Sequence, residues 1–381
     1  MTQVNEAEYT EAMAAYFREG ERLADTLGNR GSIKFNADGT LHPDIVNAYK
    51  RIGVYVLEGA LNTEEINDLR KDLTDVFDRA PYTKDAVVDG KGRPALGIEF
   101  ARQPFSFAKP LSDELGGTSL GNGRHMAKMR EPLPRDDAPD YVISKINGQL
   151  HFMDSCLRLY GHPQLLAIAE QINGPDFTPF AESIIVKPAG LGATVAWHQD
   201  GTRLWDKPDW DEDTHGFNFM AQLYGSTAAN GLWVIPGSHK EGKIDIKAMI
   251  EANNGSDCLP GAVPLVCEPG DVVMTNRQAL HGSFANTSAD QRMTINFGFH
   301  RRSSVLGLRK TENNQSIVYD DEHIFERSRI IALAIDARQQ RYTHEPRYVY
   351  QPMVGQEESN RWSDTTRESI LKDYNIRNLG I

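Results

Sequence analysis

Long apolar runs are missing from this sequence of 381 residues. No stretch reaches the roughly 18 consecutive apolar residues that a membrane-spanning helix needs, so no segment is expected to cross a bilayer. The first residues, from Met1 to Glu8, are polar and acidic and contain no apolar core of a secretory signal. We therefore expect a cytoplasmic protein with no membrane partner.

Basic residues are also in short supply. The chain has 41 lysines and arginines against 53 aspartates and glutamates, which gives a formal net charge of −12. Nucleic-acid-binding proteins need a basic stripe or patch, and anionic membrane surfaces attract basic segments. Neither nucleic acid nor a membrane surface is therefore an expected partner.

Cysteine is scarce, with three residues in the whole chain, Cys156, Cys258 and Cys267. An odd number at these spacings fits neither a disulfide framework nor a zinc site. We expect buried thiols in a reducing compartment, which agrees with a cytoplasmic location.

The sequence does contain enough apolar material for a core. A hydrophobic content of 40% and a charged content of 25% are typical of a soluble globular protein, and the length allows one large domain or two ordinary ones. Residues 1–44 are interpreted as an N-terminal arm. An apolar strand at 52–57 is then followed by Asn62 and Glu65, whose spacing is that of a capping box, so a helix is predicted through about residue 77.

Residues 81–140 are rich in glycine, proline and charge and have little periodicity. Such a stretch is typical of a surface excursion or of a lid over a binding site. In a lid, its basic side chains would reach a ligand; they include Arg124, His125, Lys128, Arg130 and Arg135. A helical pattern returns at 150–172 and ends at a Gly-Pro pair.

Short apolar strands separated by turn residues dominate the stretch from 180 to 302. We predict strands near 181–187, 194–200, 217–224, 231–235, 263–267, 271–275, 279–285 and 292–299. About eight such strands in sequence suggest a double-sheet jelly roll, and the helices before it would flank one sheet in an α+β fold. Residues 303–381 are polar except for an apolar stretch at 330–335, and we interpret them as a C-terminal extension packed on the barrel.

A histidine and a carboxylate stand two residues apart at His198 and Asp200. On an extended backbone, residues i and i+2 point to the same side, so the two side chains can aim at one point. They make two thirds of the 2-His-1-carboxylate triad that holds Fe(II) and leaves coordination positions open. A later strand supplies a second histidine, His281. Arg292 opens the following strand, and its guanidinium can bind a carboxylate through two parallel hydrogen bonds.

In order and spacing, these residues resemble the phytanoyl-CoA dioxygenase (PhyH-like) family of Fe(II)- and 2-oxoglutarate-dependent oxygenases. The motifs that carry the resemblance are His198-Gln199-Asp200, the segment Asn230-Gly231-Leu232-Trp233-Val234-Ile235-Pro236-Gly237-Ser238-His239, Pro269-Gly270-Asp271, His281-Gly282-Ser283 and Arg292. The likeness covers roughly residues 45–300. It implies a double-stranded β-helix (a cupin-like jelly roll), with a dioxygenase domain at 45–302 whose core spans about 180–302.

The resemblance implies a role for each matching residue. His198, Asp200 and His281 would be the ligands of Fe(II). Arg292 would bind the distal carboxylate of 2-oxoglutarate, and Ser283 would donate a hydrogen bond to it.

Two further residues are assigned to 2-oxoglutarate. Lys145 falls near a lysine that helps to bind this co-substrate in some members of the family. Gln222 alternates with Asn218 and Met220 on one strand, and these three side chains are expected to line the pocket. Among the remaining candidates, Arg203 would meet an acidic substrate, whereas structural roles are expected for Trp197, Trp205, His215, His239 and His300.

The implied activity is hydroxylation of an unactivated C–H bond in a small organic metabolite, with O₂ consumed and succinate and CO₂ released. Because Asp200 is present, the chloride site of related halogenases is not expected. Family members act on acyl-CoA thioesters, amino acids and other compounds, so membership does not choose the substrate. Two other classes stay open, a non-catalytic jelly-roll protein that binds a small molecule and a cupin-type metal-dependent hydrolase or isomerase. A homo-oligomer is compatible with each of them.

Overall fold

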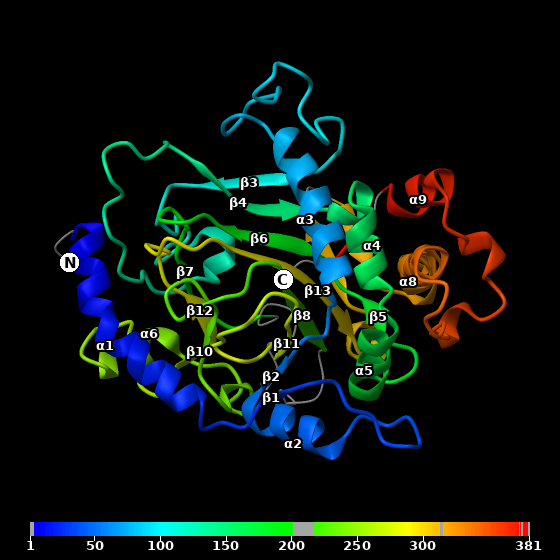
Figure 1. Ribbon diagram of the computed structural model, residues 1–381, viewed down its shortest axis with the longest axis horizontal. Helices are drawn as coiled ribbons and strands as arrows, with labels where there is room; N and C mark the ends of the chain where they lie inside the picture. Colours follow the sequence, from blue (N-terminus) through cyan, green and yellow to red (C-terminus); the bar gives the residue numbers. More distant parts are fainter. Residues whose placement is uncertain (1–3, 201–215, 313–314, 373, 375, 380–381) are drawn as a thin grey trace.

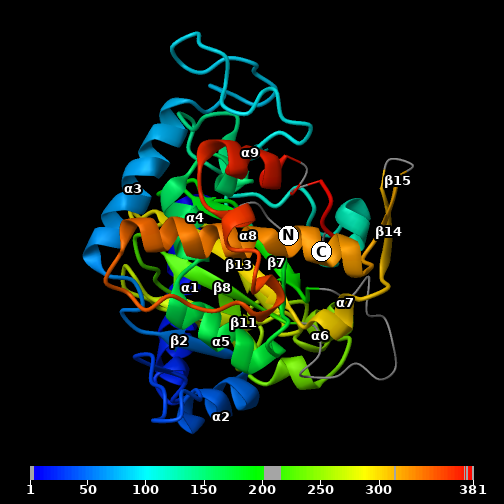
Figure 2. The same ribbon diagram turned by 90° about the vertical axis from the view of Figure 1, so that its right-hand side faces the viewer.

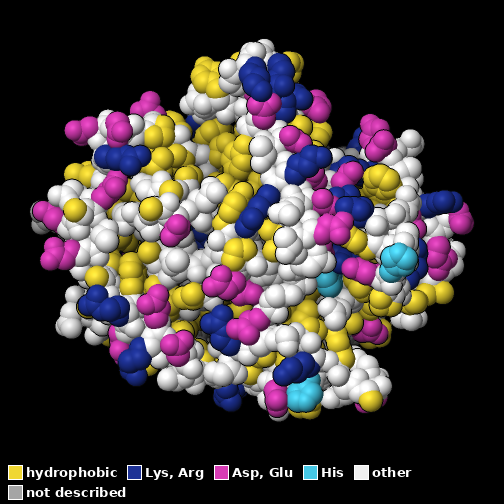
Figure 3. All heavy atoms as spheres, in the orientation of Figure 1, with side chains coloured by type: hydrophobic (Ala, Val, Ile, Leu, Met, Phe, Trp, Pro, Cys, Tyr) yellow, Lys and Arg dark blue, Asp and Glu magenta, His cyan; other side chains and the backbone are white. Residues whose placement is uncertain are grey.

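The computed structural model describes residues 4–200, 216–312, 315–372, 374 and 376–379. It shows a mixed α/β fold in which a large and a small β-sheet are covered by helices (Figure 1). Among the described helices, none is both long and apolar enough to cross a membrane. On the face drawn in Figure 3, acidic and basic side chains are interspersed.

The large sheet follows the order β1-β2-β11-β8-β13-β6-β4-β3, and the short strand β5 pairs with β13. Its first pair, β1 and β2, is parallel, and its other pairs are antiparallel. The strands are β1 (Arg30–Gly31), β2 (Val54–Leu57), β3 (Phe105–Ala108), β4 (Val142–Asn147), β5 (Thr178–Pro179), β6 (Ser183–Lys187), β8 (Phe217–Gln222), β11 (Val272–Asn276) and β13 (Arg292–His300).

The small sheet follows the order β10-β9-β12-β7, and a separate hairpin pairs β14 with β15. These strands are β7 (Val195–His198), β9 (Trp233–Val234), β10 (Val263–Pro264), β12 (His281–Ser283), β14 (Arg309–Glu312) and β15 (Gln315–Val318).

In the chain, helix α1 precedes the strands of the two sheets, α2 to α6 lie between them, and α7 to α9 follow them. They are α1 (Glu6–Ala24), α2 (Pro43–Ile52), α3 (Thr63–Asp78), α4 (Asp154–Tyr160), α5 (Pro163–Asn173), α6 (Ile246–Ala252), α7 (Arg302–Val305), α8 (Asp321–Arg341) and α9 (Asp364–Leu371). Helix α3 begins at the predicted capping box, since Asn62 and Glu65 each bond the other's backbone amide.

The two faces of the large sheet differ in chemistry. In β8, Phe217, Phe219 and Ala221 belong to the main hydrophobic core together with residues of α3, α4, α5 and α8. The alternate residues of this strand, which include Met220 and Gln222, point to the opposite side because side chains alternate along a strand. The helices therefore cover an apolar outer face, and a polar inner face is left to build a site.

Helix α1 covers the outer side of the small sheet (Figure 1). The ring of Tyr16 stacks on Trp233 of β9 with centroids 4.8 Å apart and planes 12° from parallel. A Cβ at Gly20 would overlap the same indole ring, so glycine is what lets the helix approach this closely. The predicted arm thus packs on the sheet through a specific aromatic contact.

Helix α8 lies across the outer side of the large sheet, beside α4 and α5 (Figure 2). Ile330, Ile331, Leu333 and Ala334 are fully buried in the main core, and burial of one such aliphatic side chain as large as Ile stabilises a fold by about 1.5–3 kcal/mol. The apolar stretch predicted at 330–335 is therefore the buried face of this helix.

The predicted strands between 180 and 302 are confirmed, although β9, β10 and β12 have only two or three residues each. Strands β3 and β4 were not predicted. They lie at 105–108 and 142–147, in and just after the stretch that had too little periodicity for a strand assignment, and they extend the large sheet at its β6 edge.

Candidate functional site

Three side chains converge in the interior of the molecule, where β7 ends and β12 begins. His198 ends β7, and its Cα partner across the small sheet is His281, which begins β12. The two imidazole rings have centroids 4.1 Å apart. Asp200 follows two residues after His198, and one ligand atom from each of the three residues lies within 4.8 Å of the others.

Backbone contacts fix the orientation of both imidazoles. The Nδ1 atom of His198 lies 2.7 Å from the carbonyl oxygen of Ala196, and that of His281 lies 2.9 Å from the carbonyl oxygen of Ala279. Because a carbonyl oxygen only accepts hydrogen bonds, each Nδ1 must carry the proton and each Nε2 keeps its lone pair. The lone pairs are therefore available to a metal ion.

Burial and neighbouring charges set the protonation of the three side chains. They are 3%, 8% and 8% exposed for His198, Asp200 and His281. Burial, reinforced by His281 and Arg124, holds the pKa of His198 well below its usual range, and burial also lowers the pKa of His281. Burial alone would raise the pKa of Asp200, but nearby positive charge, led by Arg124, outweighs it and lowers that pKa.

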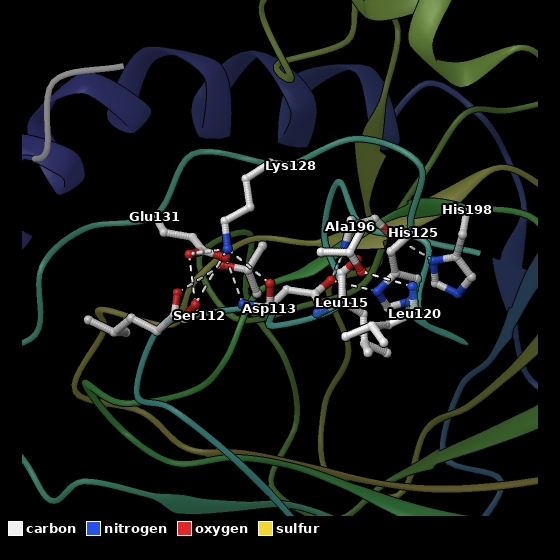
Figure 4. A network of polar contacts seen from close by, with 12 residues as sticks. Ser112, Asp113, Leu115, Leu120, His125, Lys128, Glu131, Ala196 and His198 are labelled. Carbon is white, nitrogen blue, oxygen red and sulfur yellow. Dashed lines mark hydrogen bonds and ion pairs between the residues drawn. The ribbon is translucent and has the colours of Figure 1, made fainter. Parts of the chain in front are cut away.

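A network of polar contacts supports His198 from behind (Figure 4). Asp113 accepts a hydrogen bond from the Ala196 amide at 3.0 Å and lies 2.6 Å from Nδ1 of His125. The His125 ring in turn lies against the His198 ring, with centroids 4.9 Å apart. Arg124, the neighbour of His125, forms an ion pair with Asp200. The irregular segment before β4 thus contributes directly to the site.

A second group of polar side chains lies where the inner faces of the two sheets meet. Arg292 of β13 donates through Nη1 to the carbonyl of Asn230 at 2.9 Å and approaches Ser283 Oγ at 3.4 Å. Its Nε donates to Thr294 Oγ1 at 3.0 Å, and Thr294 donates to Oε1 of Gln222 at 2.9 Å. Arg292, Ser283 and Gln222 therefore belong to one connected set of hydrogen bonds.

Lys145 is placed elsewhere. It lies on β4, where its Cα partner is Ile185 of β6. Burial lowers its pKa to about 8, and the charges with the largest further effects on it include Arg124, Arg102 and Asp200. The lysine therefore lies on the side of Asp200 rather than beside Arg292.

The structural roles expected for other residues agree with their contacts. Trp197 is buried and donates through Nε1 to the carbonyl of Asp257, His239 lies 3.1 Å from the carbonyl oxygen of Lys50, and His300 packs against Arg277. The basic residues at 128–135 pair with nearby carboxylates. Arg203, Trp205 and His215 lie outside the described residues.

Several residues of the site escaped the sequence analysis. Lys187 is buried and donates to Ser283 Oγ at 2.6 Å, and Asp113 supports His198 from a loop with no recognisable motif. Lys187 carried a usable signal, because it follows Ser183 and Ile185 at strand spacing on the inner face of β6. Asp113 carried none, since its place depends on the path of a long irregular segment.

Donor type and geometry fit a ferrous ion. Two neutral imidazoles and one carboxylate are the ligand set of non-haem Fe(II) oxygenases, in which the remaining positions stay open. The three donor atoms lie close enough to share one ion, and both imidazoles present the nitrogen that keeps a lone pair.

Comparison with known proteins identifies the same chemistry. A family model described as phytanoyl-CoA dioxygenase (PhyH) matches residues 49–294. The phytanoyl-CoA dioxygenase of Arabidopsis thaliana is 23% identical over 264 residues, which cover 67% of this chain and 87% of that protein. The ectoine dioxygenase of Halomonas elongata is 26% identical over 262 residues, which cover 59% of this chain and 75% of that protein.

Among solved structures, EctD from S. alaskensis with bound Fe superposes with a TM-score of 0.47 at 18% identity, covering 73% of this chain and 82% of that one. The family assignment itself follows from the family model, which spans more than half of the chain. The protein therefore belongs to the phytanoyl-CoA dioxygenase family of non-haem iron, 2-oxoglutarate-dependent dioxygenases.

Proposed function

We propose that this protein hydroxylates an unactivated C–H bond of a small organic metabolite, with 2-oxoglutarate converted to succinate and CO₂. In this proposal His198, Asp200 and His281 hold Fe(II). The observation that carries it is the approach of these three donors to within 4.8 Å of one another in the interior of the family's domain. A non-catalytic binding protein would have no need to bury two imidazoles and a carboxylate around one point.

We propose further that the two sheets form a double-stranded β-helix. Between residues 183 and 300 the chain passes repeatedly from one sheet to the other, with β6, β8, β11 and β13 in the large sheet and β7, β9, β10 and β12 in the small one. Contacts across the interior, such as that of Lys187 on β6 with Ser283 on β12, join the two inner faces. Residues 45–302 would be the catalytic domain, with 1–44 as an arm and 303–381 as an extension packed on the barrel.

Each side chain of the site has a task in the proposed reaction. Fe(II) with 2-oxoglutarate and O₂ supplies an oxidant able to remove hydrogen from a C–H bond. Arg292 and Ser283 would bind the distal carboxylate of 2-oxoglutarate. Asp113 and His125 keep His198 in place, and Arg124 helps to keep Asp200 ionised. Burial excludes bulk water, so these interactions act in a medium where they are stronger than in water.

The test is formation of succinate from 2-oxoglutarate with Fe(II) and ascorbate present. We expect slow turnover without an added substrate, lost in Asp200→Ala and strongly reduced in Arg292→Ala. Candidate metabolites can then be ranked by how far they accelerate succinate release. If calorimetry under anaerobic conditions detects no metal-dependent binding of 2-oxoglutarate to the wild-type protein, the proposal is wrong.

A further inference from the structure

Two buried cations lie side by side on the inner face of the large sheet. Lys187 of β6 and Arg292 of β13 are direct Cα partners in the antiparallel ladder, so their side chains leave the sheet on the same side. They are 1% and 3% exposed. Placing two positive charges together away from water is costly unless something compensates them.

The contacts of the two side chains do not provide that compensation. Lys187 donates from Nζ to Ser283 Oγ at 2.6 Å and to the carbonyl of Phe284. Arg292 donates to Thr294, to the carbonyl of Asn230 and to Ser283. Every one of these acceptors is a neutral oxygen, and no ion pair joins either cation to a carboxylate within the part of the chain that the structure describes.

Electrostatics agree with an uncompensated pair. Burial, and after it the charge of Arg292, holds the pKa of Lys187 well below its usual range. Burial also lowers the pKa of Arg292 to about 10. Asp113 acts on Lys187 in the opposite direction, but its own hydrogen bonds go to His125 and to backbone amides. An anion brought by a ligand would stabilise both cations.

We infer that Lys187 is a second cationic anchor for the distal carboxylate of 2-oxoglutarate, sharing it with Arg292 across Ser283. The inference rests on the proposed function, because it concerns the same co-substrate. Ser283 Oγ lies between the two cations, in reach of both Nζ and Nη1. A carboxylate has two oxygens and can accept from a lysine and an arginine at once.

Under this inference, Lys187 takes the role in binding 2-oxoglutarate that the family resemblance suggested for Lys145. Lys145 pairs with Ile185, which stands two residues before Lys187 on β6. The charged groups that act on Lys145 include Asp200 and Arg124. Lys187 shares a hydrogen-bond partner with Arg292, whereas Lys145 does not. Lys145 is therefore a matched control, since it is a lysine on the inner face of the same sheet.

The experiment compares two keto acids of equal chain length. Binding of 2-oxoglutarate and of 2-oxovalerate, which lacks the distal carboxylate, is measured by anaerobic calorimetry with Mn(II) in place of Fe(II). The variants are Lys187→Met, Lys187→Arg, Lys145→Met and the wild type. We expect Lys187→Met to weaken 2-oxoglutarate roughly ten- to hundredfold, the usual weight of a charge-assisted hydrogen bond, and to leave 2-oxovalerate unchanged.

Lys187→Arg should restore most of the preference for 2-oxoglutarate, and Lys145→Met should keep the wild-type ratio of the two affinities. Equal losses for both keto acids in Lys187→Met, or no loss at all, would overturn the inference, because a purely structural lysine does not distinguish them. Since a buried charge is removed, the ligand-free variant should melt no lower than the wild type, and a variant that does not fold also contradicts the inference. Absence of 2-oxoglutarate binding in the wild type is a separate result, which defeats the proposed function instead.

Discussion

Glu182 shows how strongly the interior of this protein perturbs a single side chain. It precedes β6, is 4% exposed, and neither of its carboxylate oxygens has a hydrogen-bond partner among the described residues. Burial raises its pKa to about 8, even though Arg327, Arg102 and Lys145 act to lower it. A carboxyl group in this state is protonated at neutral pH, which removes the cost of burying a charge.

The raised pKa of Glu182 makes stability depend on pH. Its folded-state pKa of about 8 exceeds the ordinary value of 4.5, so between these values the folded chain keeps a proton that the unfolded chain has lost. Stability therefore falls as pH rises through this window, by about 1.4 kcal/mol for each pH unit. Glu182→Gln lacks this loss. We expect urea denaturation to show that the free energy of unfolding of the variant, relative to that of the wild type, rises by roughly 3 kcal/mol between about pH 5.5 and about pH 8.

Glu114→Gln, at an exposed position, serves as the control for Glu182→Gln and should leave the two stability curves parallel. A constant difference between Glu182→Gln and the wild type over the whole pH range would show that Glu182 is ionised in the folded protein.

Asp113 is a second residue-scale test, because it acts on the proposed metal ligands only through other groups. It bonds the Ala196 amide and His125, both of which lie against His198. Loss of such an outer partner commonly costs 10- to 100-fold in metal affinity, as an order of magnitude. We expect Asp113→Asn to weaken Mn(II) binding by about that factor in anaerobic calorimetry.

The control for Asp113→Asn is Asp89→Asn. Asp89 is also a buried carboxylate, and it accepts hydrogen bonds from the side chain and the backbone amide of Arg93. It lies, however, in the loop after α3. Its replacement should lower the melting temperature without changing metal affinity. Equal metal affinities for Asp113→Asn and the wild type would mean that His198 is positioned by its strand alone.

At the scale of elements, helices α4 and α8 pack against each other through a close backbone approach. Gly161 ends α4, and a Cβ there would overlap the carbonyl group of Ala334 on α8. The backbone of Gly161 is in an ordinary region, with φ of −90°, so the demand for glycine comes from the neighbouring helix and not from its own conformation.

Gly161→Ala should therefore separate α4 from α8. We expect a loss of about 1–3 kcal/mol, the usual cost of forcing extra volume into a packed core, measured by chemical denaturation. The matched control is Gly90→Ala, because a Cβ at Gly90 has nothing within 4 Å. If both variants are equally stable, α8 adjusts its position freely and is not held by this contact.

The same scale explains how much of the fold the sequence could predict. The strands from β6 to β13 were predicted because they are short apolar runs separated by turn residues. The pairing of His198 with His281 followed from motif order, not from any local pattern. Strands β3, at the edge of the large sheet, and β4, beside it, were missed because strands of mixed composition have weak patterns.

For the site, the sequence could name residues whose type and spacing carry chemistry, such as His198 and Arg292. It did not name Lys187, although the strand spacing from Ser183 and Ile185 was a usable signal, because a lysine at the end of an apolar strand usually lies at the surface. Only the pairing of β6 with β13 puts this lysine beside Arg292. Residues recruited by tertiary contact, Asp113 and Glu182 among them, are invisible to local pattern for the same reason.

At the scale of the whole molecule, the C-terminal segment shares one core with the large sheet. Ile331 and Leu333 of α8 are fully buried among residues of β8, β13, α4 and α5. Tyr374, beyond α9, donates from its hydroxyl to the carbonyl of Phe180 at 2.8 Å. Elements that share a core unfold together, so the C-terminal segment and the two sheets should form one cooperative unit.

Calorimetric melting of the full chain is therefore expected to give a single transition. Ile331→Ala, which leaves a cavity between α8 and the sheet, should cost about 2–5 kcal/mol and lower the temperature of the whole transition. Val354→Ala, at a position 57% exposed, should leave that temperature unchanged, because little apolar surface is buried there. Two transitions, of which Ile331→Ala moves only one, would show that residues 303–381 fold as an independent unit and that the catalytic core does not depend on α8.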